Sequence, residues 1–273
     1  MRYANQHMHS SFASFDAKGR LEDMIAASAA AGLSLITFTD HMDMADETTG
    51  HTRNALPQRR ESFERRRTAA ESFMPPELSV RFGMELGAPM QLAEAAREAA
   101  ALPGLDFIIA SIHNLPDVQD FCIYPYADES DCEAVNRRYL AELLRMAEFP
   151  DFDVMGHIGY TARYMCRRGF SEQVTVEKYG DELRALLTRL IEQGKGIECN
   201  TSGYRDGGAP YPGADILRLY RDLGGEIITV GSDAHEPSQV FFHIREAYDL
   251  LKSCGFRYVS EFRKRQCEFI PLT

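Results

Sequence analysis

The sequence predicts an α/β barrel, in which parallel strands alternate with helices and end at a common mouth. Three observations support this fold class. Short β-rich runs alternate with longer helical patterns along most of the 273 residues. Strands linked by crossover helices must pair in parallel, which leaves an open doubly wound sheet or a closed barrel. Histidine or carboxylate side chains follow the strands, and only a closed barrel brings all of these ends to one site.

Seven pairs of strands and helices are expected in order along the chain. Arg2–Met8 is the first strand, and its helix, Leu21–Ala31, stops at Gly32. Leu33–Thr39 is a continuous apolar strand. The later strands and helices are Ser79–Leu86 with Gln91–Ala101, Phe107–Ile112 with Ser130–Glu148, Phe152–Gly156 with Val174–Gln193, Gly196–Asn200 with Ala214–Leu223, and Glu226–Val230 with Gln239–Cys254.

One segment, Arg53–Phe73, does not fit this alternation of strands and helices. It carries five arginines among glutamates between Arg59 and Glu71, and it indicates a charged helix inserted between the second and third strands. A solvated helix surface explains such a pattern. A lid whose arginines attract an anionic substrate is the alternative.

Composition limits the partners of the protein. The net charge of −11 disfavours nucleic acid, so a small-molecule substrate is expected. The six cysteines form no CxxC pair and are expected to be reduced thiols. The longest apolar runs, such as Leu33–Phe38, are far too short to span a membrane. We therefore expect one domain over residues 1–273, in the cytoplasm and without a membrane partner; the oligomeric state is left open.

Six of the eight histidines fall at predicted strand ends, and only His51 and His243 do not. His7 and His9 are two residues apart, so their side chains point the same way from one strand. Single histidines or carboxylates in apolar strand ends would be costly to bury unless something pairs with them. The residues concerned are His7, His9, Asp40, His41, Glu85, His113, His157, Glu198, Asp233 and His235. Together they predict a site for several metal ions.

These motifs resemble those of the polymerase and histidinol phosphatase (PHP) family of metal-dependent phosphoesterases. The motifs occur in order as His7-x-His9, Thr39-Asp40-His41, Glu85, His113, His157 and Asp233-x-His235. The resemblance covers nearly the whole chain, from residue 7 to residue 235. It implies a distorted (β/α)7 barrel, similar to a TIM barrel, that holds three divalent metal ions.

The resemblance also implies how the ligands are shared. His7, His9, Glu85 and Asp233 would hold one ion, Glu85, His113 and His157 a second, and Asp16, His41 and His235 a third. Asp16 stands where some branches of the family have histidine, and its harder oxygen could favour manganese or iron over zinc. Zinc, manganese and iron all remain open.

Within the family, the chain is most similar to the histidinol-phosphate phosphatases of histidine biosynthesis. This implies hydrolysis of L-histidinol phosphate, with Glu85, Asp233, His235 and Arg163 as catalytic residues. Arg163 and Arg205 are expected on loops at the mouth, where a guanidinium can grip phosphate oxygens. Glu198 is the candidate contact for the cationic part of the substrate.

Three alternatives remain beside this expectation. Another PHP activity, on nucleotides or other small phosphate esters, would use the same metals. An amidohydrolase barrel also begins with His-x-His, but it usually relies on a lysine at a middle strand end, and no lysine lies between Lys18 and Lys178. A nonenzymatic metal-binding regulator would be expected to lose ligands, and none is missing.

Overall fold

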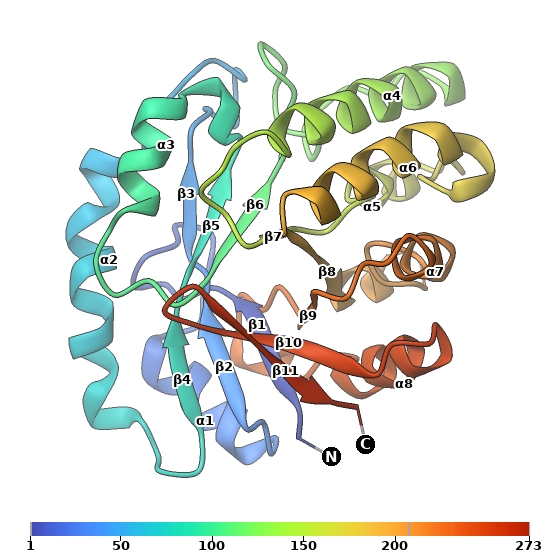
Figure 1. The fold of residues 1–273 in the computed structure, drawn as a ribbon. Helices are drawn as coiled ribbons and strands as arrows, with labels where there is room; N and C mark the ends of the chain where they lie inside the picture. The colour runs from blue at the N-terminus through green and yellow to red at the C-terminus, as the bar shows by residue number, and fades with distance from the viewer. Residues whose placement is uncertain (1, 207, 273) are drawn as a thin grey trace.

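Parallel strands form the centre of the molecule, and helices surround them (Figure 1). The computed structural model describes residues 2–206 and 208–272. The central strands are β1 (Ala4–Met8), β2 (Leu35–Phe38), β3 (His41–Asp43), β4 (Ser79–Phe82), β5 (Met84–Gly87), β6 (Ile108–Ser111), β7 (Val154–Met155), β8 (Gly196–Asn200) and β9 (Ile228–Gly231). The predicted α/β class with parallel strands is confirmed.

The central strands belong to two sheets that continue one another. One sheet has the order β1-β2-β4 and the other the order β3-β5-β6-β7-β8-β9, with every pairing parallel. The predicted single strand Ser79–Leu86 is wrong, because it breaks at Gly83 into β4 and β5. At Gly83 the backbone approaches the Phe107 carbonyl so closely that a Cβ would collide with it. The break turns β5 into the second sheet.

The ring of strands has a seam between β1 and β9. Within the described residues only the isolated bridge from Met8 to Ala234 links these two strands as a pair. Two flanking backbone bonds support it, from the His9 N–H to the Ala234 carbonyl at 2.8 Å and from the Asp233 N–H to the His7 carbonyl at 2.8 Å. The ladders are therefore interrupted, which agrees with the distorted barrel that the family resemblance implied.

The helices lie mostly where the sequence predicted them. They are α1 (Leu21–Ala30), α2 (Leu56–Ala70), α3 (Ala93–Ala100), α4 (Glu129–Met146), α5 (Thr161–Arg167), α6 (Val176–Glu192), α7 (Ala214–Asp222) and α8 (Ile244–Ser253), with short 3₁₀ turns η1 (Glu71–Phe73), η2 (Pro89–Gln91), η3 (Thr201–Arg205) and η4 (Pro237–Gln239). Asp128 caps α4 by accepting from the Asp131 N–H, and Thr175 caps α6 through the Lys178 N–H. Among the described residues, no helix is both long and apolar enough to span a bilayer.

The amphipathic helices α6, α7 and α8 each bury an apolar stripe in the core. In α8 the buried residues are Ile244, Ala247, Tyr248 and Leu251, which recur at the three- and four-residue spacing of one helix face. The strands they cover are buried on both sides, as continuous apolar runs such as Leu35–Phe38 predict. This core fixes the strand ends and the side chains that leave them.

A hairpin that the sequence analysis did not predict closes the opposite end of the barrel. It consists of β10 (Tyr258–Arg263) and β11 (Gln266–Pro271), joined by a turn in which Lys264 and Arg265 both have positive φ. Gln6 of β1 donates to the Ser260 carbonyl at 2.6 Å. The hairpin crosses the strands at their amino-terminal ends (Figure 1), opposite the end where the predicted ligands line a cavity.

Candidate metal centre

The predicted ligands meet at the carboxyl ends of the strands, around a cavity of about 310 Å³. Those that line the cavity are Asp16, His41, Glu85, His113, His157, Asp233 and His235. His7 and His9 are completely buried beneath it and contact the Glu85 carboxylate. All nine predicted ligands therefore gather at one place, although they come from positions spread between residues 7 and 235.

Glu85 lies at the centre of the cluster, with imidazole nitrogens around both of its carboxylate oxygens. Oε1 is 2.8 Å from His157 Nε2 and 3.2 Å from His113 Nε2, while Oε2 is 3.0 Å from His41 Nδ1, 3.3 Å from His7 Nε2 and 3.6 Å from His9 Nε2. A carboxylate surrounded in this way can bridge two cations, one at each oxygen.

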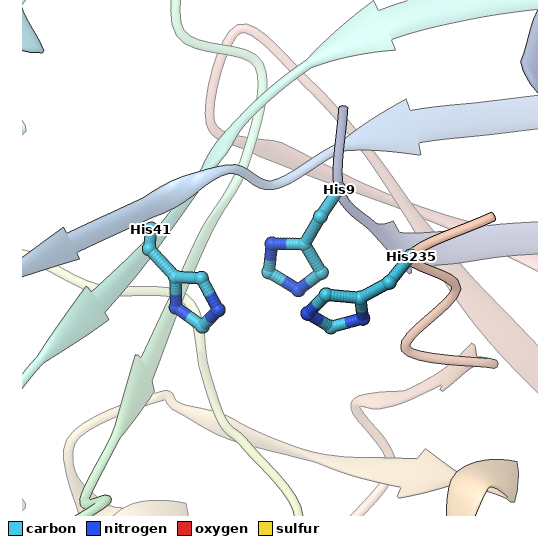
Figure 2. A group of neighbouring side chains, drawn as sticks. All are labelled: His9, His41 and His235. Carbon is cyan, nitrogen blue, oxygen red and sulfur yellow. The ribbon is translucent and has the colours of Figure 1, made fainter. Parts of the chain in front are cut away.

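A second group lies on the outer side of the cluster. Figure 2 shows His9, His41 and His235 with their rings gathered together, and the His9 ring stacks at 4.3 Å on each of the other two. Asp16 Oδ2 is 3.0 Å from His235 Nε2 and 3.4 Å from His41 Nε2. The aspartate therefore lies where the third predicted site needs its oxygen ligand.

Hydrogen bonds at Nδ1 decide which ring nitrogen four of the histidines present to the cluster. The Nδ1 partners are Glu198 Oε1 for His7 at 2.7 Å, Ser14 Oγ for His9 at 3.3 Å, Asp43 Oδ1 for His113 at 3.2 Å and the Asp233 carbonyl for His235 at 3.0 Å. A proton held at Nδ1 leaves the lone pair of Nε2 free, as a metal ligand requires.

Burial and neighbouring charges shift the pKa values of these groups in opposite directions. Burial, together with the adjacent His41 and His235, lowers the pKa of His9 to about 4. Burial also opposes the charge on His113, but Glu85 and Asp43 outweigh it and raise its pKa to about 10. The site therefore holds imidazoles that differ strongly in their affinity for a proton.

The carboxylates stay ionised in spite of their burial. Burial alone would raise the pKa of Glu85, but His7, His113 and His41 hold it well below its usual range. The pKa of Asp233 is likewise far below its ordinary value, because His7 and His9 outweigh the effect of burial. Negative charge is thus concentrated at the point where the imidazole nitrogens converge.

The backbone is strained at two of the ligands. His157 and Asp233 have φ angles of 21° and 54°, in the left-handed region that residues other than glycine seldom adopt. Such conformations persist only where the surrounding structure enforces them, and they cluster at functional sites. Here they turn the two side chains from the strand ends into the cluster.

These residues fit divalent metal ions. His7 Nε2 and His9 Nε2 face each other at 3.1 Å, and both rings have a partner for their proton at Nδ1. With both Nδ1 protons committed, a cation placed between the two Nε2 atoms and the nearby Glu85 would bind both lone pairs. The donor separations around Glu85, from 2.8 to 3.6 Å, bracket the edge of about 3.3 Å of a tetrahedron with ligand bonds of roughly 2.0–2.1 Å.

Arg163 lines the cavity, as expected, but it lies on the short helix α5 rather than on a loop. Its Nη2 donates to Ser202 Oγ and lies 3.5 Å from Asp233 Oδ2, and its guanidinium lies 4.8 Å from the centre of the Tyr160 ring. Its buried Nε has no hydrogen-bond partner among the described residues, and Asp206 Oδ2 lies 3.9 Å from it. The guanidinium therefore brings a positive charge to the cavity wall.

The structure does not place Arg205 and Glu198 where a substrate in the cavity would touch them. Arg205, on η3, donates to the Ser232 carbonyl at 3.1 Å and to Gln239 Oε1 at 3.3 Å, behind the cavity wall. Glu198 is 1% exposed and accepts bonds from His7 Nδ1 and, at 3.0 Å, from the His157 N–H. Both side chains hold ligand-bearing segments in position.

Two carboxylates have roles that the sequence analysis missed. Asp43 lines the cavity and orients His113, and its position two residues after His41 in β3 was the available signal. Asp40 was expected near the metal, but its carboxylate points away from the ligands and bonds Ser10, Ser14 and Arg66.

Helix α2 has features of both interpretations of the charged segment Arg53–Phe73, a solvated helix surface and a lid whose arginines attract an anionic substrate. Arg60 and Arg65 form exposed ion pairs with Glu98 and Glu61, as a solvated helix surface predicts. Arg59 lines the cavity beside Phe15, 5.3 Å from the centre of its ring. Arg66 is fully buried. The helix therefore forms one wall of the cavity and is anchored into the core.

Comparison with known proteins identifies the family. The model of the PHP domain matches residues 5–202. The histidinol-phosphatase of Lactococcus lactis is 25% identical over 263 residues, 96% of this chain and 95% of that protein. A probable histidinol-phosphatase of Thermotoga maritima is 27% identical over 256 residues, 94% of each chain.

A solved structure has the same fold. The crystal structure of histidinol phosphate phosphatase from Lactococcus lactis, complexed with zinc, L-histidinol and phosphate, superposes with a TM-score of 0.78 at 24% identity, covering 98% of this chain and 99% of that one. The family match ends before Asp233 and His235, which the fold brings to the other ligands. The chain belongs to the PHP domain family, as its motifs predicted.

Proposed function

We propose that this protein is a metal-dependent phosphomonoesterase that hydrolyses L-histidinol phosphate to L-histidinol and inorganic phosphate. The observation that carries the proposal is the ring of imidazole nitrogens around Glu85 next to Arg163, a buried arginine that lines the same cavity. A cluster for cations beside a guanidinium suits a phosphate dianion. The names of the relatives support the choice of ester.

The ligands divide among three ions in this proposal. His7, His9, Glu85 and Asp233 would hold the first, Glu85, His113 and His157 the second, and Asp16, His41 and His235 the third. When bound, the ions neutralise the ester and lower the pKa of water that attacks phosphorus. The mixed nitrogen and oxygen donors suit zinc, manganese or iron.

The chain's own residues position the ester and handle protons. Arg163 donates from its guanidinium to the equatorial phosphoryl oxygens and stabilises their charge as the bond to the leaving group breaks. Ser202 and Asp233 hold the guanidinium in that orientation. His235, whose side chain is 25% exposed, can pass a proton to the leaving group only from a ring nitrogen that holds no ion, whereas Asp233, whose pKa lies well below its ordinary value, acts as a ligand and not as an acid.

The cavity also suits a cationic leaving group. Glu47 and Asp120 line its wall and lie near each other. Burial and the neighbouring Asp120 raise the pKa of Glu47. A positive charge placed there would relieve this repulsion, and histidinol carries an ammonium group. These two carboxylates replace Glu198 as the proposed contact for the cationic part of the substrate.

A direct assay tests the proposal. Inorganic phosphate release is compared for L-histidinol phosphate, a nucleoside monophosphate and a nucleoside 3′,5′-bisphosphate, with the protein loaded with zinc or manganese. A kcat/KM that is highest for L-histidinol phosphate supports the proposal. Preference for either nucleotide would establish the alternative within the PHP family, and no turnover of any ester would favour a metal-binding regulator.

A further inference from the structure

A buried ion pair connects helix α2 to the metal centre. Arg66 of α2 is 1% exposed, and its Nη1 donates to Asp40 Oδ2 at 2.9 Å. Its Nη2 donates to the Gly83 carbonyl, at the break between β4 and β5. Asp40 itself lies at the break between β2 and β3. One guanidinium therefore joins the two points where the first sheet passes into the second.

The other oxygen of Asp40 holds the loop that follows β1. Oδ1 accepts from the Ser10 N–H at 2.7 Å, from Ser10 Oγ at 3.1 Å and from Ser14 Oγ at 3.1 Å. The carboxylate is completely buried, and donors surround it on both oxygens. A carboxylate in this position only accepts hydrogen bonds, so the single hydroxyl proton of Ser14 is committed to it.

The hydrogen bond from Ser14 to Asp40 determines how Ser14 interacts with the neighbouring metal ligands. With its proton on Asp40, Ser14 Oγ must accept from its other neighbours, which are the His41 N–H at 3.1 Å and His9 Nδ1 at 3.3 Å. His9 therefore carries its proton on Nδ1 and turns the lone pair of Nε2 toward Glu85 and Asp233. The same hydroxyl fixes the backbone of His41.

We propose that Arg66 is a positioning residue for the metal centre, which acts through Asp40 and Ser14 to fix the tautomer and orientation of His9 and the position of His41. The inference rests on the metal centre of the proposed function, but it concerns metal affinity and not the choice of substrate. Outer partners of this kind change metal affinity by about 10–100-fold when they are removed.

The experiment measures metal binding by the full chain, without substrate. Zinc affinity is determined by competition with a chromophoric chelator for Arg66→Met, for Ser14→Ala and for the control Arg65→Met, whose arginine is exposed on the same helix and pairs with Glu61. We expect binding to weaken by about 10–100-fold in the first two proteins and to stay unchanged in the third.

Ser14→Ala tests whether a loss of metal affinity in Arg66→Met comes only from a disturbed fold, because Ser14→Ala leaves the buried ion pair of Arg66 and Asp40 intact. Nitrogen-15 spectra of histidine-labelled, metal-free protein give a second readout, in which the Nδ1-protonated form of His9 should be lost in Ser14→Ala and retained in Arg65→Met. Wild-type zinc affinity and an unchanged His9 spectrum in Ser14→Ala would overturn the inference. Intact metal binding with no ester turnover in the wild type would instead count against the proposed function alone.

Discussion

The buried ligand carboxylates at the mouth of the barrel and the buried carboxylates at its opposite end face different bases. At the mouth, Glu85 and Asp233 face imidazoles. At the opposite end, Asp153 lies 2.6 Å from Arg265, Glu261 lies 2.8 Å from Arg2, and Asp106 lies 2.7 Å from Arg67. A guanidinium never loses its proton and cannot ligate a metal, whereas an imidazole can do both.

This difference separates stability from chemistry in the fold. The arginine pairs stabilise the hairpin and the beginnings of the strands whether or not metal is present. A guanidinium keeps its proton, and a metal ion does not bind it. The imidazole groups hold their carboxylates only until a metal ion takes the place of the protons. Changes at the mouth should therefore alter activity, and changes at the opposite end should alter stability.

Metal removal should have the largest effect. After dialysis against a strong chelator, phosphate release from L-histidinol phosphate should fall to background, because the ester then lacks its neutralising charges. Secondary structure measured by circular dichroism should persist, since the arginine pairs remain. Re-addition of zinc or manganese should restore turnover. If protein that metal analysis shows to be free of metal were fully active, the proposed dependence of the chemistry at the mouth on metal would be wrong.

Glu85→Gln should lower kcat by about 10³-fold or more, since several kcal/mol of transition-state stabilisation depend on the ions that this carboxylate bridges. Steady-state kinetics and metal content per chain provide the measurements. Glu261→Gln is the matched control, because it removes a buried glutamate from the opposite end. Equal kinetic losses in the two variants would show that the ends do not differ.

Arg163→Met should reduce kcat/KM by about 10²–10³-fold, the usual cost of a lost donor to a developing oxyanion. Arg163→Lys should recover part of the loss. Arg167→Met on the same helix removes an exposed arginine that pairs with Asp206 and should leave the kinetics unchanged. Indistinguishable effects of the Arg163 and Arg167 substitutions would remove Arg163 from the site.

Arg265→Met should destabilise the fold by about 1–3 kcal/mol, because it leaves the buried Asp153 carboxylate without its charged partner. Urea unfolding of the metal-free protein measures this loss, and kcat/KM of the metal-loaded protein should match that of the wild type. A marked fall in kcat/KM would show that the hairpin end communicates with the mouth.

The smallest effect concerns Glu261 and pH. Burial raises its pKa above the ordinary value of 4.5, although Arg2 and Arg81 oppose this. A raised pKa stabilises the fold below pH 4.5, and this contribution disappears as the pH rises through the pKa of the folded state. Relative to wild type, metal-free Glu261→Gln should therefore gain stability as the pH rises above 4.5. If the free energies of unfolding of the two proteins changed with pH in parallel, the raised pKa of Glu261 would be refuted.

The metal ligands could be predicted from the sequence because strands of apolar residues fix their direction. His113 and His157 follow closely on the buried strands β6 and β7 and emerge at the mouth. Glu198 could not be separated from Glu85 by its position, because each lies two residues before the end of its strand. The difference is tertiary, since His7 Nδ1 and the His157 N–H occupy the Glu198 carboxylate.

Other features could not be predicted because they depend on tertiary contacts. The break at Gly83 follows from the approach of Phe107 and Arg66, and neither is close in sequence. The turn of the C-terminal hairpin uses Lys264 and Arg265 at positive φ, where glycine or asparagine would have given a recognisable signal. Periodicity alone could not distinguish Arg66, which is buried, from Arg65 beside it, which is exposed.

The seam between β1 and β9 has a consequence for the lifetime of the folded protein. His7 and His9 stand on one side of it and Asp233 and His235 on the other, close to opposite ends of the chain. An ion shared across the seam cross-links these distant segments, as a disulfide would, and removes entropy from the unfolded chain. The metal-loaded enzyme should open more slowly and resist proteases longer than the empty one.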